Sequence, residues 1–345
     1  MRRSKSKVTI TDIALRAGVS ATAVSAALHG TGRVSDGQRE LIQKLAIEMN
    51  YQPSVAAQIM RSNGANGIAL VISDDYEAAT ESGFTAPLIA CFVRKCEMER
   101  LRYHIDFARE EMEISPAPPS MRGGLVSGAI VAGKMPDPLR EWINGQDRYP
   151  WVCIDDPAPY TVVSSVDDAM EEAVSRLAAL RHQRIAFGGC NRDILTHAMI
   201  QDGFKKAMRE YDLRVDESCF ALFDIKSRVE MLAEYTTFVD ELLSGSSRPT
   251  AVVCADSKLA RVVVYVAMKL GLKVPEDLSV IGYGTSGDAE KGIPCLTMVQ
   301  PDFAGMIDKS VTILQHLTDG KRIETGTHRV PAKFIQRNTV TWAKV

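Results

Sequence analysis

Two short helical patterns separated by a tight turn occupy residues 8–30, with the sequence VTITDIALRAGVSATAVSAALHG. Thr9 or Thr11 can cap the first helix, and apolar residues then recur at helical spacing. Gly18 breaks that helix, and Ser20 can cap the second one. Because helices this short must pack across each other to bury their apolar faces, the stretch predicts a helix-turn-helix.

Charge is distributed unevenly along the 345 residues. Residues 1–64 contain nine Lys and Arg against four Asp and Glu, a net charge of +5. Since the whole chain has a net charge of -2, the remaining 281 residues carry -7. A small basic head on an acidic body indicates a polyanionic partner for the head alone, and the helix-turn-helix makes double-stranded DNA the expected partner.

The second helix of the head presents small side chains outward. Val24, Ala27 and Leu28 form its inward apolar stripe. We expect bases to be read by methyl contacts and single hydroxyl hydrogen bonds, not by a bidentate arginine. The outward positions are Ala21, Thr22, Ser25, Ala26 and His29.

Residues 35–64 extend the head by a third helix and one short segment. The string SDGQ at 35–38 resembles a capping box, and Leu41, Ile42, Leu45, Ala46 and Met49 predict an apolar stripe. Pro53 ends this pattern, because the residue before a proline is pushed out of the α region. The following SVAAQIMRSNG predicts a short helix that needs a partner to become ordered. A three-helix bundle without a DNA role is the alternative for the head.

The head resembles the lac/galactose repressor (LacI/GalR) family of bacterial transcription regulators in ITDIALRAGVSATAVSAALHG, GRVS and NYQPSVAAQIMRS. The resemblance implies a helix-turn-helix domain at 1–50, a hinge helix at 51–64 and an effector-binding and dimerisation domain at 65–345. It implies base reading by Ala21, Thr22 and Ala26, and a hinge helix that enters the minor groove through Ala57 and Met60. The other expected DNA-binding or helix-positioning residues are Thr9, Ser20, Ser25, His29, Arg33, Ser35, Asn50 and Tyr51.

Two head residues depart from the family pattern. Ala26 stands where many members carry Arg or another polar base reader, and Met60 replaces the usual Leu wedge. The resemblance therefore implies the binding mode without implying the operator sequence.

From residue 66 onward, short apolar strands alternate with amphipathic helices. Such strands predict parallel sheets covered on both faces, and two sets of them predict two lobes with a ligand cleft at the carboxyl ends of the strands. The N-lobe is expected at about 65–164 plus 295–325, and the C-lobe at about 165–294 plus 326–345. The Pro-rich string EEMEISPAPPSMRGG predicts a surface loop.

The string GYGTSG at 282–287 has the form GxGxxG directly after a strand pattern. A dinucleotide fingerprint must open a helix whose N-terminus faces the pyrophosphate. The next residues contain Gly292 and Pro294 and predict a loop, which disfavours a nucleotide-dependent enzyme. The other alternative, a solute-binding module, leaves residues 1–64 without a use.

The seven cysteines (91, 96, 153, 190, 219, 254 and 295) form no CxxC or Cys/His cluster, and the six histidines form no HExxH-like pair. No nucleophile elbow or Walker A string occurs either. We therefore expect no metal, no cofactor and no catalytic residue, with the cysteines packed in the core in a reducing compartment. Without an export signal or an apolar window of about 20 residues, the expected location is the cytoplasm, away from membranes.

The body resembles the periplasmic-binding-protein-like regulatory domain of the same family in VSSVDDAMEEAVSRLAALRHQRIAF, KLGLKVPEDLSVIGY and VPAKFIQRNTV. The chain departs from that pattern at Ile200 and Gly284, which replace a common Arg and a usual Asp. Their loss implies a less polar effector, differently placed polar groups, or a pocket that no longer binds a small molecule. The expected effector-binding residues are Ser73, Asp74, Phe84, Asp155, Ile200, Asp256, Ser257 and Gly284.

Together, the resemblance implies a repressor that binds a near-palindromic operator as a homodimer, which could pair further into a tetramer. A small-molecule effector, a sugar or another metabolite, would modulate the affinity for DNA from the interlobe cleft.

Overall fold

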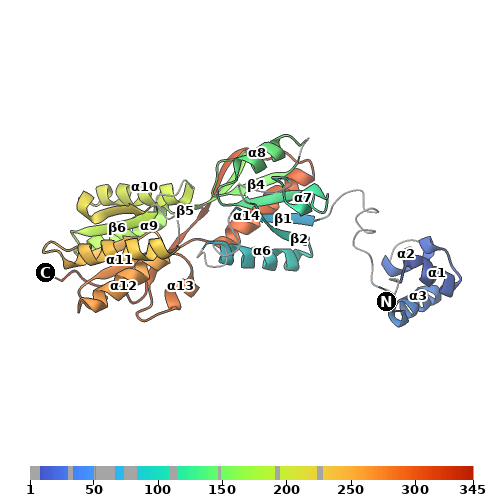
Figure 1. The fold of residues 1–345 in the computed structure, drawn as a ribbon, viewed down its shortest axis with the longest axis horizontal. Helices are drawn as coiled ribbons and strands as arrows, with labels where there is room; N and C mark the ends of the chain where they lie inside the picture. Colours follow the sequence, from blue (N-terminus) through green and yellow to red (C-terminus); the bar gives the residue numbers. More distant parts are fainter. Residues whose placement is uncertain are drawn as a thin grey trace. The chain divides into compact units, whose positions relative to one another are not determined.

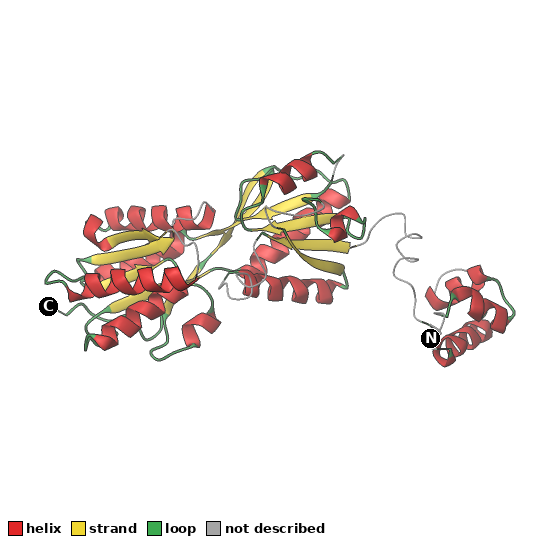
Figure 2. Cartoon of the chain, viewed as in Figure 1, coloured by secondary structure: helices red, strands yellow, loops and turns green. Residues whose placement is uncertain are grey.

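The computed structural model describes residues 8–29, 34–49, 51, 67–73, 84–108, 115–146, 149–190, 195–223 and 228–344. Its contacts divide the chain into two units, residues 1–65 and 66–345. The first unit is the helical head, and the second contains two α/β lobes (Figures 1 and 2). Among the described helices, none is both long and apolar enough to cross a membrane.

Three helices form the head: α1 (Ile10–Ala17), α2 (Ala21–His29) and α3 (Asp36–Glu48). Thr9 caps α1 reciprocally, because the Asp12 carboxylate accepts from the Thr9 N–H at 2.7 Å while the Thr9 hydroxyl accepts from the Asp12 N–H at 3.3 Å. Gly18 has φ 66°, a left-handed conformation that turns the chain toward α2. The Ser20 hydroxyl accepts from the Ala23 N–H at 3.1 Å. The predicted caps of the first two helices are confirmed.

The head core is small and comes from all three helices. Its buried side chains are Ile13, Ala14, Val24, Ala27, Ile42 and Ala46. Leu41 is 47% exposed, so the prediction that it shares the stripe of Ile42 is wrong. Adjacent residues point about 100° apart on a helix, and Ile42 takes the inward direction. Ser35 precedes α3 but its hydroxyl makes no capping bond, so the predicted capping box is wrong as well.

The N-lobe is a parallel sheet with the strand order β11-β5-β4-β3-β1-β2. Helices α6 (Thr85–Glu99) and α14 (Phe303–Thr318) cover one face, and α7 (Pro119–Arg122) and α8 (Asp137–Asn144) cover the other (Figure 1). The strands are β1 (Gly67–Ile72), β2 (Arg102–Phe107), β3 (Gly128–Ala132), β4 (Trp151–Ile154), β5 (Tyr160–Ser165) and β11 (Gly326–Pro331).

The C-lobe sheet has the order β12-β10-β9-β8-β6-β7 and is parallel except for β12, which runs antiparallel to β10. Its strands are β6 (Ile185–Cys190), β7 (Phe220–Phe223), β8 (Ala251–Cys254), β9 (Ser279–Tyr283), β10 (Thr297–Gln300) and β12 (Lys333–Ile335). One face packs against α9 (Asp167–Ala179) and α10 (Leu195–Glu210), and the other against α11 (Arg228–Ser244) and α12 (Ser257–Lys269). A short 3-10 helix, Glu217–Cys219, precedes β7.

The chain crosses between the lobes at different residues from those expected. Strand β10 lies in the C-lobe sheet, although 295–325 was predicted to belong to the N-lobe, and β11 lies in the N-lobe sheet, although 326–345 was predicted to belong to the C-lobe. The pairing partner decides this, since β10 bonds to β9 and β11 bonds to β5. The predicted surface loop before residue 125 is also partly wrong, because Ala117, Ser120 and Met121 are buried beneath the N-lobe sheet.

His182 is buried and ties the C-terminal segment to the C-lobe. Its ring nitrogens lie 2.9 Å from the Thr250 hydroxyl and 2.9 Å from the Thr341 carbonyl oxygen. Burial lowers the pKa of His182, so the unfolded chain takes up a proton more readily than the folded protein. The stability that neutral His182 contributes is therefore present above about pH 6.5 and is lost as the pH falls below it.

We expect His182→Gln to flatten the fall in the free energy of unfolding between about pH 7 and about pH 5. At neutral pH the same change should lower that free energy by about 1–3 kcal/mol, because a buried partner is lost. Chemical denaturation over this pH range measures both effects, with His316→Gln on α14 as the control. If the free energy of unfolding of His182→Gln fell with pH as in the wild type, buried His182 would not be the cause of that fall.

Candidate DNA-reading face and effector cleft

Helix α2 presents the predicted reading positions on the side opposite the head core. Ala21 and Thr22 are exposed, and Ser25 and Ala26 are half-buried. Val24, on the inward side, is fully buried. A helix with such small outward side chains can approach a groove closely and offer methyl groups and a hydroxyl to base edges.

The other predicted DNA-binding residues of the head have mixed surroundings. The Thr9 hydroxyl donates to the Asp12 carboxylate at 2.7 Å, and the Ser20 hydroxyl caps α2, so both position helices. Ser35 is exposed before α3, and Tyr51 packs against the head core with its N–H donating to the Ala46 carbonyl at 2.9 Å. Outside the described residues lie Arg33, Asn50, Ala57, Met60 and the side chain of His29.

In the N-lobe, predicted effector residues follow the carboxyl ends of parallel strands. Ser73 follows β1, and its N–H donates to the Ala132 carbonyl at 3.0 Å. Asp155 follows β4 and is 1% exposed. The Phe84 ring packs edge-on against Phe303 at 5.3 Å, which joins it to α14. Asp74 lies outside the described residues.

In the C-lobe, protein groups already surround the Asp256 carboxylate. One oxygen accepts from the N–H groups of Lys258 at 2.6 Å and Leu259 at 2.8 Å, which caps α12. The other accepts from the Tyr235 hydroxyl at 2.5 Å and lies 3.8 Å from the Cys190 thiol. Tyr235 is fully buried, and burial with the nearby Asp256 charge raises its pKa. Asp256 therefore stabilises the start of α12, with few lone pairs left for a ligand.

Sequence reasoning missed Tyr235 and Cys190 as partners of Asp256. Tyr235 comes from α11, on the face of the sheet that α12 also covers, and Cys190 ends β6. No local pattern links these residues, because the sheet alone brings their elements together.

The two residues that depart from the family pattern in the body, Ile200 and Gly284, have no polar side chain and are closely packed in the structure. Ile200 is fully buried in the C-lobe core. Gly284 has φ 149°, and a Cβ there would lie 3.3 Å from Ser257 Cβ and 3.3 Å from an oxygen of Asp288. A side chain at residue 284 would therefore displace its neighbours. Where the family pattern has Arg and Asp, this chain therefore has a buried apolar side chain and a closely packed glycine.

The GxGxxG string leads into a helix of five residues, α13 (Ser286–Glu290), where a loop was predicted. Thr285 caps this helix, so that part of the prediction is wrong. The Asp288 carboxylate accepts from the Thr285 N–H at 3.2 Å and from its hydroxyl at 2.8 Å. Because a carboxylate already occupies this N-terminus, a pyrophosphate would meet negative charge there.

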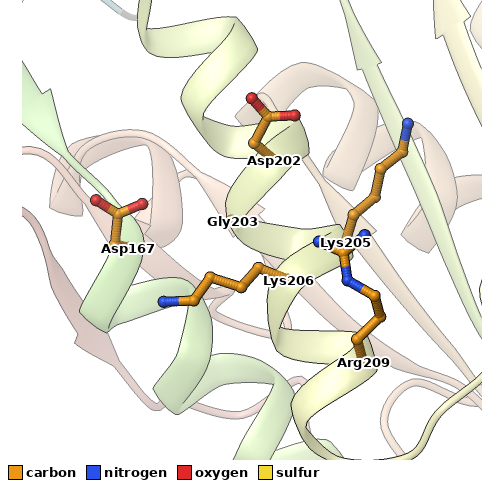
Figure 3. A pocket seen from close by; sticks show the side chains of 6 residues that line it. All are labelled: Asp167, Asp202, Gly203, Lys205, Lys206 and Arg209. Atoms are coloured by element: carbon orange, nitrogen blue, oxygen red, sulfur yellow. The ribbon is translucent and has the colours of Figure 1, made fainter.

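A hollow of about 250 Å³ lies between the start of α9 and α10 (Figure 3). Lys206 extends from α10 toward Asp167 at the start of α9 (Figure 3). Asp167 also pairs with Arg329 at 2.8 Å. The lining residues carry charges of both signs and do not define a ligand. Its lining residues are Asp167, Asp202, Gly203, Lys205, Lys206 and Arg209.

Metal-ligating side chains do not gather in the described part of the chain. No three His, Cys, Asp or Glu residues there are placed to hold a metal ion.

Two family models match the chain. Residues 9–54 match the model of bacterial regulatory proteins of the lacI family, and residues 174–340 match a periplasmic binding protein-like domain. The HTH-type transcriptional repressor PurR of Escherichia coli O1:K1 is 28% identical over 342 residues, which cover 96% of each protein. PurR of Erwinia tasmaniensis is 26% identical over the same share of both chains.

Two solved structures have the same fold. The lac repressor dimer bound to operator and the anti-inducer ONPF superposes with a TM-score of 0.83 at 22% identity, covering 97% of this chain and 99% of that one. The complex of the transcriptional regulator CelR with cellobiose gives a TM-score of 0.67 at 20% identity, covering 96% and 100%.

A helix-turn-helix head and a two-lobed periplasmic-binding-protein-like body in one chain define a class of transcription regulators. Within it, the head matches the lacI family of bacterial regulatory proteins, and the chain is similar over 96% of its length to the PurR repressors.

Proposed function

We propose that this protein is a sequence-specific transcription repressor that acts in the cytoplasm and catalyses no reaction. The observation that carries the proposal is helix α2, whose outward residues Ala21 and Thr22 are exposed while Val24 holds the helix in the head core. The net charge of +5 on residues 1–64 supports attraction to DNA. The PurR relatives are named as repressors, and the lac repressor was solved bound to its operator.

The repressor acts as a homodimer on a near-palindromic operator. Two α2 helices enter successive major grooves, and the hinge segment at 51–64 pairs with its mate in the minor groove and bends the central step. Tyr265 and Met268 of α12 and Ile293 beside it support the dimer, since they are 68%, 64% and 93% exposed. Arg261 of α12 donates to the Pro294 carbonyl at 3.0 Å, which places the loop that carries Ile293 against α12.

A small molecule in the interlobe cleft modulates the affinity for DNA. The enclosed Asp256 and the nonpolar Ile200 and Gly284 support an effector with fewer hydroxyl or anionic groups than a sugar. An effector changes DNA binding to the extent that it binds one arrangement of the lobes more tightly than the other.

The proposal is tested by mapping the genomic sites that the full-length protein protects and measuring affinity for the recovered site. Thr22→Val keeps the shape of Thr22 but removes its hydroxyl. We expect affinity for that site to fall about 5- to 150-fold, equivalent to about 1–3 kcal/mol, with nonspecific binding unchanged. Thr11→Val on the exposed side of α1 is the matched control. If no genomic site is enriched, the proposal fails.

A further inference from the structure

Asp155 joins the two lobes at the carboxyl end of β4. Its carboxylate accepts a hydrogen bond from the Thr196 hydroxyl, and its carbonyl oxygen accepts one from the Leu195 N–H at 3.2 Å. Leu195 and Thr196 open α10 of the C-lobe, whereas the Asp155 N–H donates to the Val162 carbonyl at 3.1 Å within the N-lobe. A single buried residue thus bonds to both lobes.

The second carboxylate oxygen of Asp155 is buried without a hydrogen-bond partner among the described residues, and its charge reaches the buried Tyr283 hydroxyl, which has the Ser164 hydroxyl as a neighbour. Among the described residues, this oxygen and the hydroxyls of Ser164 and Tyr283 are all buried without a hydrogen-bond partner. Burial raises the pKa of Tyr283, the Asp155 charge adds to that rise, and the adjacent Ser164 hydroxyl opposes it. Strands β5 and β9 therefore supply two neutral, buried hydroxyls to the same interlobe region as the Asp155 carboxyl group.

We propose that Asp155 is a proton-operated latch, which holds α10 firmly when its carboxyl group carries a proton and loosens the interlobe contact when that proton leaves. The protonated oxygen can donate to the Tyr283 or Ser164 hydroxyl while the other oxygen still accepts from Thr196. The ionised form leaves a buried charge whose only neutralising contacts among the described residues are hydrogen bonds from Thr196, which favours separation of the lobes and access of water. Closure, the change from the loosened to the firm contact, takes up one proton from solvent.

The protonation equilibrium agrees with this geometry. Burial raises the pKa of Asp155 to about 6, against the hydrogen bonds from Thr196, which lower it. Because this value exceeds the ordinary 3.8, closure is favoured fully below about pH 4, and the advantage is lost as the pH rises toward about 6. The difference between these two pKa values corresponds to a change of about 100-fold in the equilibrium between the firm and the loosened contact. About tenfold of this change falls between about pH 5 and about pH 7.

The pH effect of Asp155 must be distinguished from that of the other titratable groups at this contact. Burial raises the pKa values of Cys153 and Tyr283, so both stay neutral over this range. Asp156 follows Asp155, adds to the rise in the Asp155 pKa and pairs with Arg140. His197 follows Thr196 on α10.

Hydrogen–deuterium exchange of the full-length protein tests the latch at the Leu195 N–H, which crosses between the lobes. After correction for intrinsic exchange, we expect its protection to fall about tenfold between about pH 5 and about pH 7 in the wild type. In Asp155→Asn, protection should be independent of pH, since the amide is neutral and asparagine tolerates the φ of 69° at this residue. Thr196→Val removes a donor to the carboxylate and should move the transition to higher pH.

Two variants serve as controls. Asp212→Asn neutralises an exposed aspartate that also has a positive φ, and His197→Gln removes the neighbouring imidazole; both should keep the wild-type pH dependence. The same pH dependence in wild type and Asp155→Asn would overturn the latch, as would its loss in His197→Gln.

A link from the latch to DNA rests on the proposed function. If the latch controls the repressor, operator affinity changes over the same pH range in the wild type and stays constant in Asp155→Asn. Absence of operator binding at every pH refutes the proposed function and leaves the exchange result intact. Operator binding with unaltered exchange in Asp155→Asn refutes the latch alone.

Discussion

Val24→Asp is expected to abolish operator binding while the body stays folded. Val24 is fully buried in the small core that α1, α2 and α3 share. An unpaired carboxylate there costs several kcal/mol, and a head of this size has a stability of only about 3–5 kcal/mol. The head should therefore unfold, and α2 would no longer be presented to DNA. Gel-shift or anisotropy measurements on the operator detect the loss.

Leu15→Asp is the matched control, because it adds the same charge to the head at a side chain that is 88% exposed. It should keep the head folded and retain most of the operator affinity. The body forms a separate unit, so its thermal unfolding should be the same in both variants. Full operator affinity in Val24→Asp would show that the head does not need this core to read DNA.

Arg140→Met is expected to lower the free energy of unfolding of the body by about 3–5 kcal/mol. The Arg140 guanidinium pairs with Asp156, whose side chain is 7% exposed. Without Arg140, the Met135 N–H, at 3.1 Å, is the donor that the buried carboxylate keeps among the residues that the structure describes. Chemical denaturation measures the loss. Since Asp156 follows Asp155 directly, the same variant should also lower the protection of the Leu195 N–H.

The double variant Arg140→Met/Asp156→Asn should recover most of this stability, because a neutral amide oxygen still accepts from the Met135 N–H. Arg329→Met breaks a pair of the same type with Asp167, where the two side chains are 55% and 42% exposed. That control should change the stability by about 0–1 kcal/mol. Equal losses in Arg140→Met and Arg329→Met would contradict the importance of burial at Asp156.

Local patterns predicted the head well, because its helix boundaries depend on residues a few positions apart. The Thr9 to Asp12 capping box, the left-handed Gly18 and the Ser20 cap all lie within one or two turns of the groups that they satisfy. The prediction at Ser35 was wrong although the same type of pattern is present. Capping residues offer hydrogen bonds, and the rotamer that the fold selects decides whether they form.

The cleft was predicted less completely, because its polar groups are satisfied across the fold. Position along the chain indicated Asp155 and Asp256, yet their surroundings differ. Asp256 is enclosed by Tyr235 and by the first turn of α12. Asp155 retains an unbonded oxygen at the lobe junction, where Thr196 and Tyr283 come from elements of the other lobe.

The sequence by itself determined the helix-turn-helix, the basic head on an acidic body and the alternation of strands and helices, since periodicity, capping and charge are properties of neighbouring residues. Only the tertiary structure decided which lobe each of β10 and β11 joins and which carboxylate oxygen is buried without a hydrogen-bond partner. Strand pairing and hydrogen-bond satisfaction depend on residues distant in the chain, and these meet only when the two sheets are assembled.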